Sequence, residues 1–181
     1  MSEKFRIRPA TEADAPALLA VYAPFVEDTV VSFEDEVPSL EDFAGRIRKS
    51  LSRWQWLVAE AGNEVAGYAY GGPFHQRAGY RWSVEVSVYL DPRFHRRGIG
   101  RALYERLLAE LTDMGYCMAY AGVTLPNDAS VALHREFGFE WVGTYRRAGR
   151  KFGAWHDVGW MQLELRDLPL RSRGRPGVCD A

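Results

Sequence analysis

One segment of the chain restricts its fold more than any other, because a strand pattern, a glycine turn and a helix pattern follow one another directly. Ser83–Leu90 (SVEVSVYL) alternates as a half-buried strand does, and apolar side chains recur at helical spacing from Ile99 to Leu111. A further strand-like run follows at Tyr116–Thr124. This order predicts a right-handed crossover between two parallel strands, with the glycine turn at the carboxyl edge of the sheet.

Two strand hairpins flank this crossover. The first is expected at Trp56–Glu60 and Val65–Gly71, and the second at Glu140–Arg147 and Trp155–Leu165. A short alternating run at Phe5–Arg8 adds one more strand. Together these elements predict an α/β (α+β) fold with a central, mixed, mostly antiparallel and twisted sheet of about seven strands.

About four helices are expected to flank this sheet. Thr11 and Asp14 resemble a capping box, and Pro24 predicts a kink or an early end of the helix that follows. Ser39 can cap a second helix, and a third follows the glycine turn. The fourth is short and begins after Asn127.

Length and composition favour one globular domain. The 181 residues, of which 47% are hydrophobic, suffice for one packed core, expected over residues 1–165, and the irregular residues 166–181 predict a flexible C-terminal tail. A formal net charge of −1 argues against specific nucleic-acid binding, and no apolar run approaches the ~20 residues that span a membrane. Without an apolar secretion segment, a cytoplasmic location is expected. Cys117 and Cys179 indicate neither a disulfide framework nor a metal site.

The glycine turn, RRGIGR, has the chemistry of an anion site. Gly98 and Gly100 allow the backbone to approach a ligand closely, and the amides at the start of a helix favour negative charge. A Walker loop would need Gly-Lys-Ser or Gly-Lys-Thr, and a dinucleotide fingerprint would need a third glycine where Leu103 stands. The surrounding positive charge comes from Arg93, His95, Arg96, Arg97 and Arg101. The alternatives are a structural turn or a solvated helix start with surface salt bridges.

Glu85 is the acidic residue in the middle of the Ser83–Leu90 strand. It lies on the strand face opposite Val84 and Val86, so a sheet covered by helices on both faces would bury its carboxylate. Burial raises the pKa of a carboxylic acid toward neutrality, which suits a general base. The alternative is a strand with one solvated face.

His134 and the loop between Phe74 and Trp82 can each be interpreted as functional or as purely structural. His134 lies on the fourth expected helix, three residues beyond Val131, where a hydrogen-bonded core histidine is the ordinary interpretation in isolation. The residues between Phe74 and Trp82 form an aromatic and basic loop just before the Glu85 strand. Such a loop can bind an anionic small molecule or can pack on its own core.

Several segments together resemble the GNAT superfamily of acetyl-CoA-dependent N-acetyltransferases. The phosphate loop of that superfamily has the pattern Gln/Arg-x-x-Gly-x-Gly/Ala, and the corresponding residues here are HRRGIG, with His95 at the first position. Within the superfamily the chain is similar to the phosphinothricin and methionine sulfoximine acetyltransferases across Phe5–Leu165. The similar segments are RPATEAD, WLVAE, GYAYGGP, VEVSVYLDPR, LPNDASVALHREFGF and KFGAWHDVGWMQLEL.

This resemblance implies a GNAT fold, in which two strands splay apart to admit the pantetheine arm, and acetyl-CoA as the cosubstrate without a metal. It implies that Glu85 is the general base and that His134 is the acid that reprotonates the departing thiolate. The implied cofactor-binding residues are Val88, Tyr89, Leu90, His95, Arg96, Arg97, Gly98, Ile99, Gly100, Arg101, Asn127 and Ser130. Backbone N–H groups near Val88 would stabilise the oxyanion.

The resemblance also implies the acceptor and the assembly. The acceptor would be a small amino acid analogue such as L-phosphinothricin, methionine sulfoximine or methionine sulfone, acetylated on its α-amino group by direct attack, and the protein would be a homodimer. The expected acceptor-binding residues are Phe74, His75, Gln76, Arg77, Tyr80, Trp82, Glu85, Val86 and Ser87. The alternatives are a GNAT enzyme for another small amine or a peptide amine, and a non-catalytic acyl-CoA-binding module.

Overall fold

The computed structural model describes residues 5–166. Helices and strands follow one another in the order that the sequence predicts. The helices are α1 (Ala15–Glu27), α2 (Leu40–Leu51), α3 (Ile99–Asp113) and α4 (Asp128–Glu136). The strands are β1 (Phe5–Pro9), β2 (Trp56–Ala61), β3 (Glu64–Pro73), β4 (Ser83–Leu90), β5 (Met118–Thr124), β6 (Glu140–Lys151) and β7 (Ala154–Glu164). Three short 3₁₀ turns add Glu12–Asp14, Ala78–Tyr80 and Pro92–Phe94.

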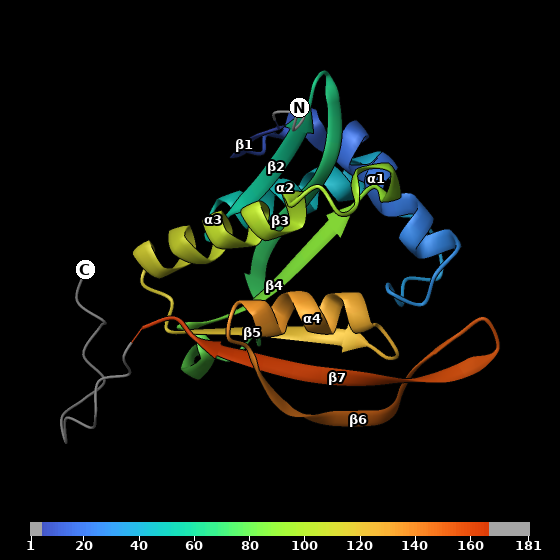
Figure 1. Cartoon of the computed structure of the whole chain (residues 1–181), viewed down its shortest axis with the longest axis vertical. Coiled ribbons are helices and arrows are strands. Elements are labelled where there is room, and N and C mark those ends of the chain that lie inside the picture. Colours follow the sequence, from blue (N-terminus) through green and yellow to red (C-terminus); the bar gives the residue numbers. More distant parts are fainter. Residues whose placement is uncertain (1–4, 167–181) are drawn as a thin grey trace.

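The seven strands form one sheet in the order β1-β2-β3-β4-β5-β7-β6 (Figure 1). Only β4 and β5 are parallel neighbours, and the remaining pairs are antiparallel. The parallel pair is joined through α3, so the crossover predicted from the strand, glycine turn and helix pattern is confirmed. The sheet twists strongly, and β6 and β7 run across the direction of β2 and β3 (Figure 1).

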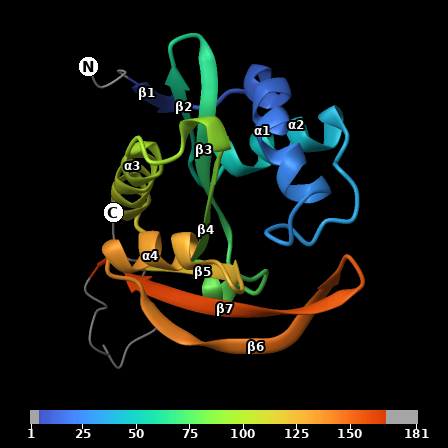
Figure 2. The same ribbon diagram turned by 45° about the vertical axis from the view of Figure 1, so that its right-hand side comes forward.

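The helices cover both faces of this sheet (Figure 2). On one face, α3 and α4 close a core that includes Val84, Val86 and Leu107. On the other face, α1 and α2 pack over a second core that includes Tyr68 and Tyr89. The alternation of β4 therefore sends its valines toward α3 and Glu85, Ser87 and Tyr89 toward α1 and α2, as the sequence predicts.

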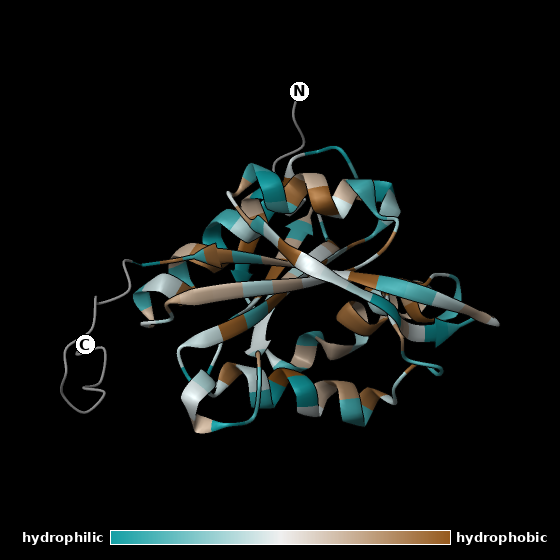
Figure 3. Ribbon diagram, turned by 90° about the horizontal axis from the view of Figure 1, so that it is seen from below, coloured by the Kyte–Doolittle hydropathy of each residue, from teal (hydrophilic) through white to brown (hydrophobic). Residues whose placement is uncertain are grey.

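Local signals explain the helix boundaries. Ser39 Oγ accepts a hydrogen bond from the amide of Asp42 at 3.1 Å and caps α2. Thr11 and Asp14 form the expected capping box around the 3₁₀ turn that precedes α1. Pro24 lies inside α1, which continues for three more residues to Glu27. The helices carry apolar and polar stripes, as helices at a sheet surface do (Figure 3).

The β6–β7 hairpin is longer than the sequence suggested, and its tip is tied to the connection between α1 and α2. Lys151, 5% exposed, donates hydrogen bonds from Nζ to the carbonyls of Val26 at 2.5 Å and Ser32 at 2.7 Å. These bonds satisfy the buried ammonium group and hold the hairpin tip against the α1–α2 connection.

None of the helices in residues 5–166 is both long enough and apolar enough to cross a membrane. Apart from Arg166, the C-terminal tail expected at 166–181 lies outside the described residues.

Candidate active site

The central feature of the site is a separation of the two parallel strands. β4 and β5 pair only through Ser83 with Met118, Val84 with Ala119 and Glu85 with Tyr120. Beyond Glu85 the strands part, although β4 continues to Leu90 and β5 to Thr124. The backbone groups on this edge of β4 therefore have no strand partner in β5 and can bind an extended ligand.

A small cavity of about 60 Å³ lies in this gap. Its walls come from both separated strands and from the two helices on the α3 face. The lining residues include Val86, Ser87, Val88 and Tyr89 of β4, Gly122, Val123 and Thr124 of β5, Tyr104 of α3, and Ser130 and His134 of α4. The side chain of Val86, which was expected to contact the acceptor, belongs to the α3 core, so Val86 lies on the face opposite Glu85.

A larger groove of about 510 Å³ continues from the gap to the glycine loop. Val88, Asn127 and Ser130 line both cavities and join them. The groove is also lined by Leu90, His95, Arg96, Gly98, Ile99, Gly100 and Arg101. The structure thus brings most of the predicted cofactor-binding residues to one continuous surface.

The glycine loop has the backbone geometry of an anion-binding turn. Arg96 has φ 59° and Gly98 has φ 79°, and α3 begins at Ile99 with Gly98 as its N-terminal cap. Left-handed residues next to a helix start turn successive amides toward the same side. A Cβ on Gly100 would lie 2.9 Å from Cδ1 of Leu90, so a larger residue there would displace the end of the Leu90 side chain.

The side chains around the loop have different roles from one another. His95 Nε2 donates a hydrogen bond to the carbonyl of Leu90 at 3.3 Å, so this histidine fastens the loop to the end of β4. Arg101 forms an ion pair with Glu136 of α4, and the side chain of Ile99 is buried in the core. Ile99 can therefore contribute only its backbone to ligand binding.

Asn127 joins the groove to α4. Its Oδ1 accepts a hydrogen bond from the amide of Ser130 at 3.1 Å and caps the helix. Asn127 also lines the groove, and its contact with the cofactor stays a prediction.

The loop and the gap together fit coenzyme A. A helix start with left-handed residues suits a pyrophosphate, and the unpaired edge of β4 offers N–H and C=O groups to an amide-containing arm. The groove connects the two. The basic residues of the groove suit the anionic end of such a molecule, and its apolar residues suit the extended thioester arm.

Glu85 is the last residue of β4 that pairs with β5, so its backbone lies where the strands part. Its cross-strand partner on β3 is Gly72, whose missing side chain leaves space on the Glu85 face. Burial raises the pKa of the Glu85 carboxyl group above its ordinary value. Within residues 5–166, no side chain forms an ion pair with it. A half-buried, unpaired carboxylate of this kind can accept a proton from a ligand.

His134 is buried beside the gap, with both ring nitrogens hydrogen-bonded. Nδ1 lies 2.7 Å from the carbonyl of Ser130, which can only accept, so Nδ1 carries the proton. Nε2 lies 2.9 Å from the hydroxyl of Tyr104. Burial lowers the pKa of His134, so the neutral ring is favoured and its Nε2 accepts the Tyr104 hydrogen.

Tyr104 was not identified from the sequence. It lies on the core face of α3, fully buried, and its ring lines the gap between the strands. In the sequence, Tyr104 stands out only as a residue with a hydroxyl group among the leucines of an apolar helix face. The sequence does not show which group this hydroxyl contacts.

The predicted acceptor loop divides into two groups. Phe74 stacks on Tyr120, with ring centroids 3.9 Å apart, and packs against Trp160, and Trp82 lies under the Arg81 guanidinium. His75, Gln76, Arg77 and Tyr80 instead line a separate cavity of about 620 Å³. Phe74 thus borders the Glu85 face from the β5 side, and the polar residues of the loop surround the neighbouring space.

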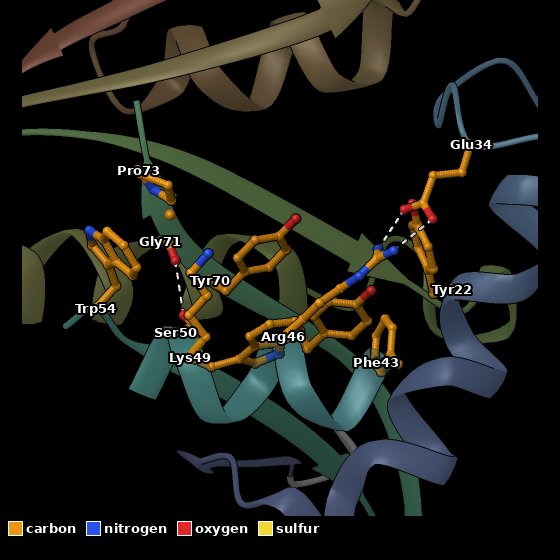
Figure 4. Close-up of a pocket in the computed structure, with 13 residues that line it drawn as sticks. Tyr22, Glu34, Phe43, Arg46, Lys49, Ser50, Trp54, Tyr70, Gly71 and Pro73 are labelled. Carbon is orange, nitrogen blue, oxygen red and sulfur yellow. Dashed lines mark hydrogen bonds and ion pairs between the residues drawn. The ribbon is translucent and has the colours of Figure 1, made fainter. Parts of the chain in front are cut away.

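An aromatic pocket of about 210 Å³ also lies on the Glu85 face, between α2 and β3 (Figure 4). Tyr70, Gly71 and Gly72 form one wall, and Tyr70 is the cross-strand neighbour of Ser87 on β4. Arg46 closes one end through a two-point ion pair with Glu34, at 2.6 and 2.9 Å. Arg46 was not identified from the sequence as a pocket residue, because α2 has the pattern of an ordinary surface helix.

The described residues contain no cluster of three or more His, Cys, Asp or Glu side chains that could hold a metal ion.

Comparison with known proteins gives concordant matches. A family model described as an acetyltransferase (GNAT) domain matches residues 7–160. A phosphinothricin N-acetyltransferase of Streptomyces viridochromogenes is 41% identical over 170 residues, which cover 94% of this chain and 91% of that protein. An L-methionine sulfoximine/L-methionine sulfone acetyltransferase of Salmonella typhimurium is 34% identical over 160 residues, which cover 88% of this chain and 94% of that protein.

A solved structure extends the similarity to the fold. The crystal structure of a GNAT superfamily phosphinothricin acetyltransferase from Sinorhizobium meliloti, in complex with acetyl-CoA, matches with a TM-score of 0.90 and 31% identity. The match covers 99% of this chain and 97% of that one. The similarity therefore extends over the glycine loop, the strand gap and the Glu85 region together.

Proposed function

The chain belongs to the GNAT family of acetyltransferases, and we propose that it transfers an acetyl group from acetyl-CoA to the α-amino group of a small amino acid analogue. L-phosphinothricin, methionine sulfoximine and methionine sulfone are the proposed acceptors, in line with the names of its relatives. The observation that carries the proposal is the parting of β4 and β5 immediately after Glu85, because this brings a carboxylate to the mouth of an extended ligand slot.

On the donor side, the loop amides from Arg97 to Arg101 would hold the pyrophosphate, and the β4 edge from Val88 to Leu90 would hold the pantetheine arm. Acetyl-CoA supplies an acetyl group activated as a thioester. The chain would orient this group by holding the cofactor at both its pyrophosphate and its pantetheine arm. Such positioning in a ternary complex accounts for much of the rate in reactions of this kind.

On the acceptor side, Glu85 is the proposed general base. An amine is protonated in neutral water and must lose a proton before it can attack a carbonyl carbon. Because burial raises its pKa, the Glu85 carboxylate is a stronger base than an exposed one. It would remove the proton directly or through one water molecule.

His134 is the proposed acid, and its proton would reach the leaving thiolate through the Tyr104 hydroxyl. The neutral ring has no N–H directed into the gap, since Nδ1–H is bound to Ser130. When Nε2 is protonated it donates to the Tyr104 oxygen, and the Tyr104 hydrogen is then released toward the gap. A lowered pKa makes the protonated ring a stronger acid.

Turnover tests the proposal. The protein, acetyl-CoA and each of the three proposed acceptors should release free thiol and give an N-acetyl product detectable by mass spectrometry. No turnover with any of them would contradict the acceptor assignment. Turnover with a polyamine or a peptide amine instead would favour the alternative of a GNAT enzyme with another acceptor.

A homodimer is the proposed assembly. β6 is an edge strand of the sheet, and the hairpin it forms with β7 exposes large apolar side chains. They are Trp141, Val142, Tyr145, Phe152 and Trp155. Light scattering should give the mass of a dimer for the wild type and of a monomer when Val142 and Trp155 are changed to lysine; a monomeric wild type would contradict the proposal.

A further inference from the structure

The cavity beside the acceptor loop is lined by cations from two separate elements. Lys49 and Arg53 come from the end of α2 and the turn after it, and Arg77 and Arg81 come from the loop between β3 and β4. No Asp or Glu lies among the lining residues of this cavity of about 620 Å³. Four cations around one space create a positive potential that favours an anionic ligand.

Two of these cations, Lys49 and Arg53, also differ from the neighbouring arginines of α2 in how they are paired. On α2, Arg46 is paired with Glu34 and Arg48 with Glu12. Within residues 5–166, no carboxylate is in ion-pair distance of Lys49 or Arg53. Their charge is thus available for an external anion, whereas that of Arg46 and Arg48 is already neutralised.

The cavity is within reach of Glu85. Ser83 lines it, and Ser83 and Glu85 lie on the same face of β4, two residues or about 7 Å apart along the strand. In a γ-substituted amino acid, four covalent bonds separate the amine from the polar atom of the head, or about 5 Å when extended. An acceptor whose amine contacts Glu85 can therefore place its head at the mouth of this cavity.

The cavity adjoins the aromatic pocket shown in Figure 4, because Lys49, Trp54 and Pro73 line both. Lys49 lies on α2 at the aromatic pocket (Figure 4) and also lines the cationic cavity. Trp54, Tyr80 and Tyr116 supply apolar surface for methylene or methyl groups. Apolar side chains and cations together suit a ligand with a short apolar chain that ends in an oxyanion.

We infer that Lys49 of α2 and Arg53 of the turn after it, with Arg77 and Arg81, form an anion site that makes this enzyme select acceptors with an acidic head over those with a neutral head of similar shape. The inference rests on the proposed function and specifies its acceptor class. Phosphinothricin, with its phosphinate, belongs to the favoured class, and methionine sulfone, with an uncharged tetrahedral sulfone, belongs to the disfavoured one.

The test compares these two acceptors in the wild type and in a Lys49→Met, Arg53→Met double variant. The wild type should show at least a tenfold higher kcat/KM for phosphinothricin. The double variant should lose at least tenfold on phosphinothricin and change less than about twofold on methionine sulfone, since tenfold corresponds to about 1.4 kcal/mol of lost interaction. Arg48→Met, on the same helix and paired with Glu12, is the matched control and should keep the wild-type ratio.

Two kinetic results would overturn the inference: no preference in the wild type, or an equal loss on both acceptors in the double variant. Calorimetric binding of phosphinothricin to the same proteins separates this inference from the proposed function. If the wild type binds phosphinothricin and the double variant does not, the anion site stands even when no acetylation is detected. If both bind it equally, the anion site is rejected even when acetylation occurs.

Discussion

The hydroxyl of Tyr104 on α3 donates a hydrogen bond to Nε2 of His134 on α4 across 2.9 Å. Both side chains line the gap between β4 and β5, and since the other ring nitrogen donates to the carbonyl of Ser130, this hydroxyl is the partner that can pass a proton from Nε2 of His134 into the gap. A buried histidine that could be taken for a simple core residue is thereby linked to the reaction space. Its proposed acid role depends on Tyr104 as much as on the ring itself.

Replacement of Tyr104 by phenylalanine should lower kcat about tenfold or more and leave the KM for acetyl-CoA within about twofold, because only the proton route is removed. The loss should be largest with acceptors for which chemistry limits the rate. Because the variant leaves a buried nitrogen without its donor, the free energy of unfolding should fall by about 1–3 kcal/mol. Stopped-flow thiol detection and chemical denaturation measure the two effects.

Thr112→Val is the control for this variant. Thr112 Oγ1 donates to the carbonyl of Leu108 on the same helix, at 2.7 Å, away from the gap. It should alter stability slightly and kcat not at all. If Tyr104→Phe also keeps full kcat, His134 does not act through this hydroxyl.

The pH dependence of kcat/KM should report the raised pKa of Glu85. The base works only when it is deprotonated, so activity falls as the pH decreases through that pKa. Since burial raises the value above the ordinary 4.5 of a glutamate, the acid limb should lie above pH 4.5. A profile that stays flat down to pH 4.5 for an acceptor whose amine pKa is known would contradict this environment for Glu85.

Alanine at the loop glycines should weaken coenzyme A binding for two different reasons. Gly98→Ala forces an L residue into a left-handed conformation, at a cost of about 1–2 kcal/mol, although no atom lies within 4 Å of the new Cβ. Gly100→Ala pushes against Leu90, which lines the groove. Calorimetry should give at least a tenfold higher Kd for coenzyme A in both variants.

Gly45→Ala is the matched control, since Gly45 lies inside α2 with no atom within 4 Å of the methyl group that alanine would add. It should stabilise the protein by about 0.5–1 kcal/mol and leave coenzyme A binding unchanged. Equal binding in all three variants would show that the loop backbone does not hold the pyrophosphate.

Lys151→Met should loosen the hairpin tip from the connection between α1 and α2. The change keeps the apolar stem and removes the ammonium group that donates to Val26 and Ser32, so two carbonyls lose their partner. The expected loss in free energy of unfolding is about 1–3 kcal/mol. Arg150→Met, on the exposed side of the same strand, should cost little in the same denaturation experiment, and equal stability of both variants would contradict the structural role of Lys151.

The elements that could be predicted from the sequence are those with a local signal. The alternation of Ser83–Leu90 places Glu85 on one strand face, and the glycine turn before α3 predicts the anion-binding edge, so both follow from periodicity and turn chemistry. The strand gap itself does not, because a strand pattern does not specify where pairing stops.

The remaining site residues depend on contacts between distant segments. Tyr104 meets His134 from 30 residues away, and Lys151 meets Val26 from 125 residues away, so neither residue carries a local mark of its role. Lys49 lies on the polar side of an amphipathic helix and Arg53 in the exposed turn after it, where cations are ordinary. Only the fold brings them beside the acceptor loop and leaves them without carboxylate partners.

Glu85→Gln tests the central claim most directly. The variant keeps the shape of the side chain and removes the base, so thiol release with acetyl-CoA and phosphinothricin should fall about 10²–10⁴-fold, with an unchanged Kd for coenzyme A by calorimetry. Because the raised pKa means that folding disfavours the ionised carboxylate, the variant should also melt at a higher temperature than the wild type at pH 8. Unchanged turnover with intact cofactor binding would reject Glu85 as the base and, with it, the assignment of catalysis to the point where β4 and β5 part.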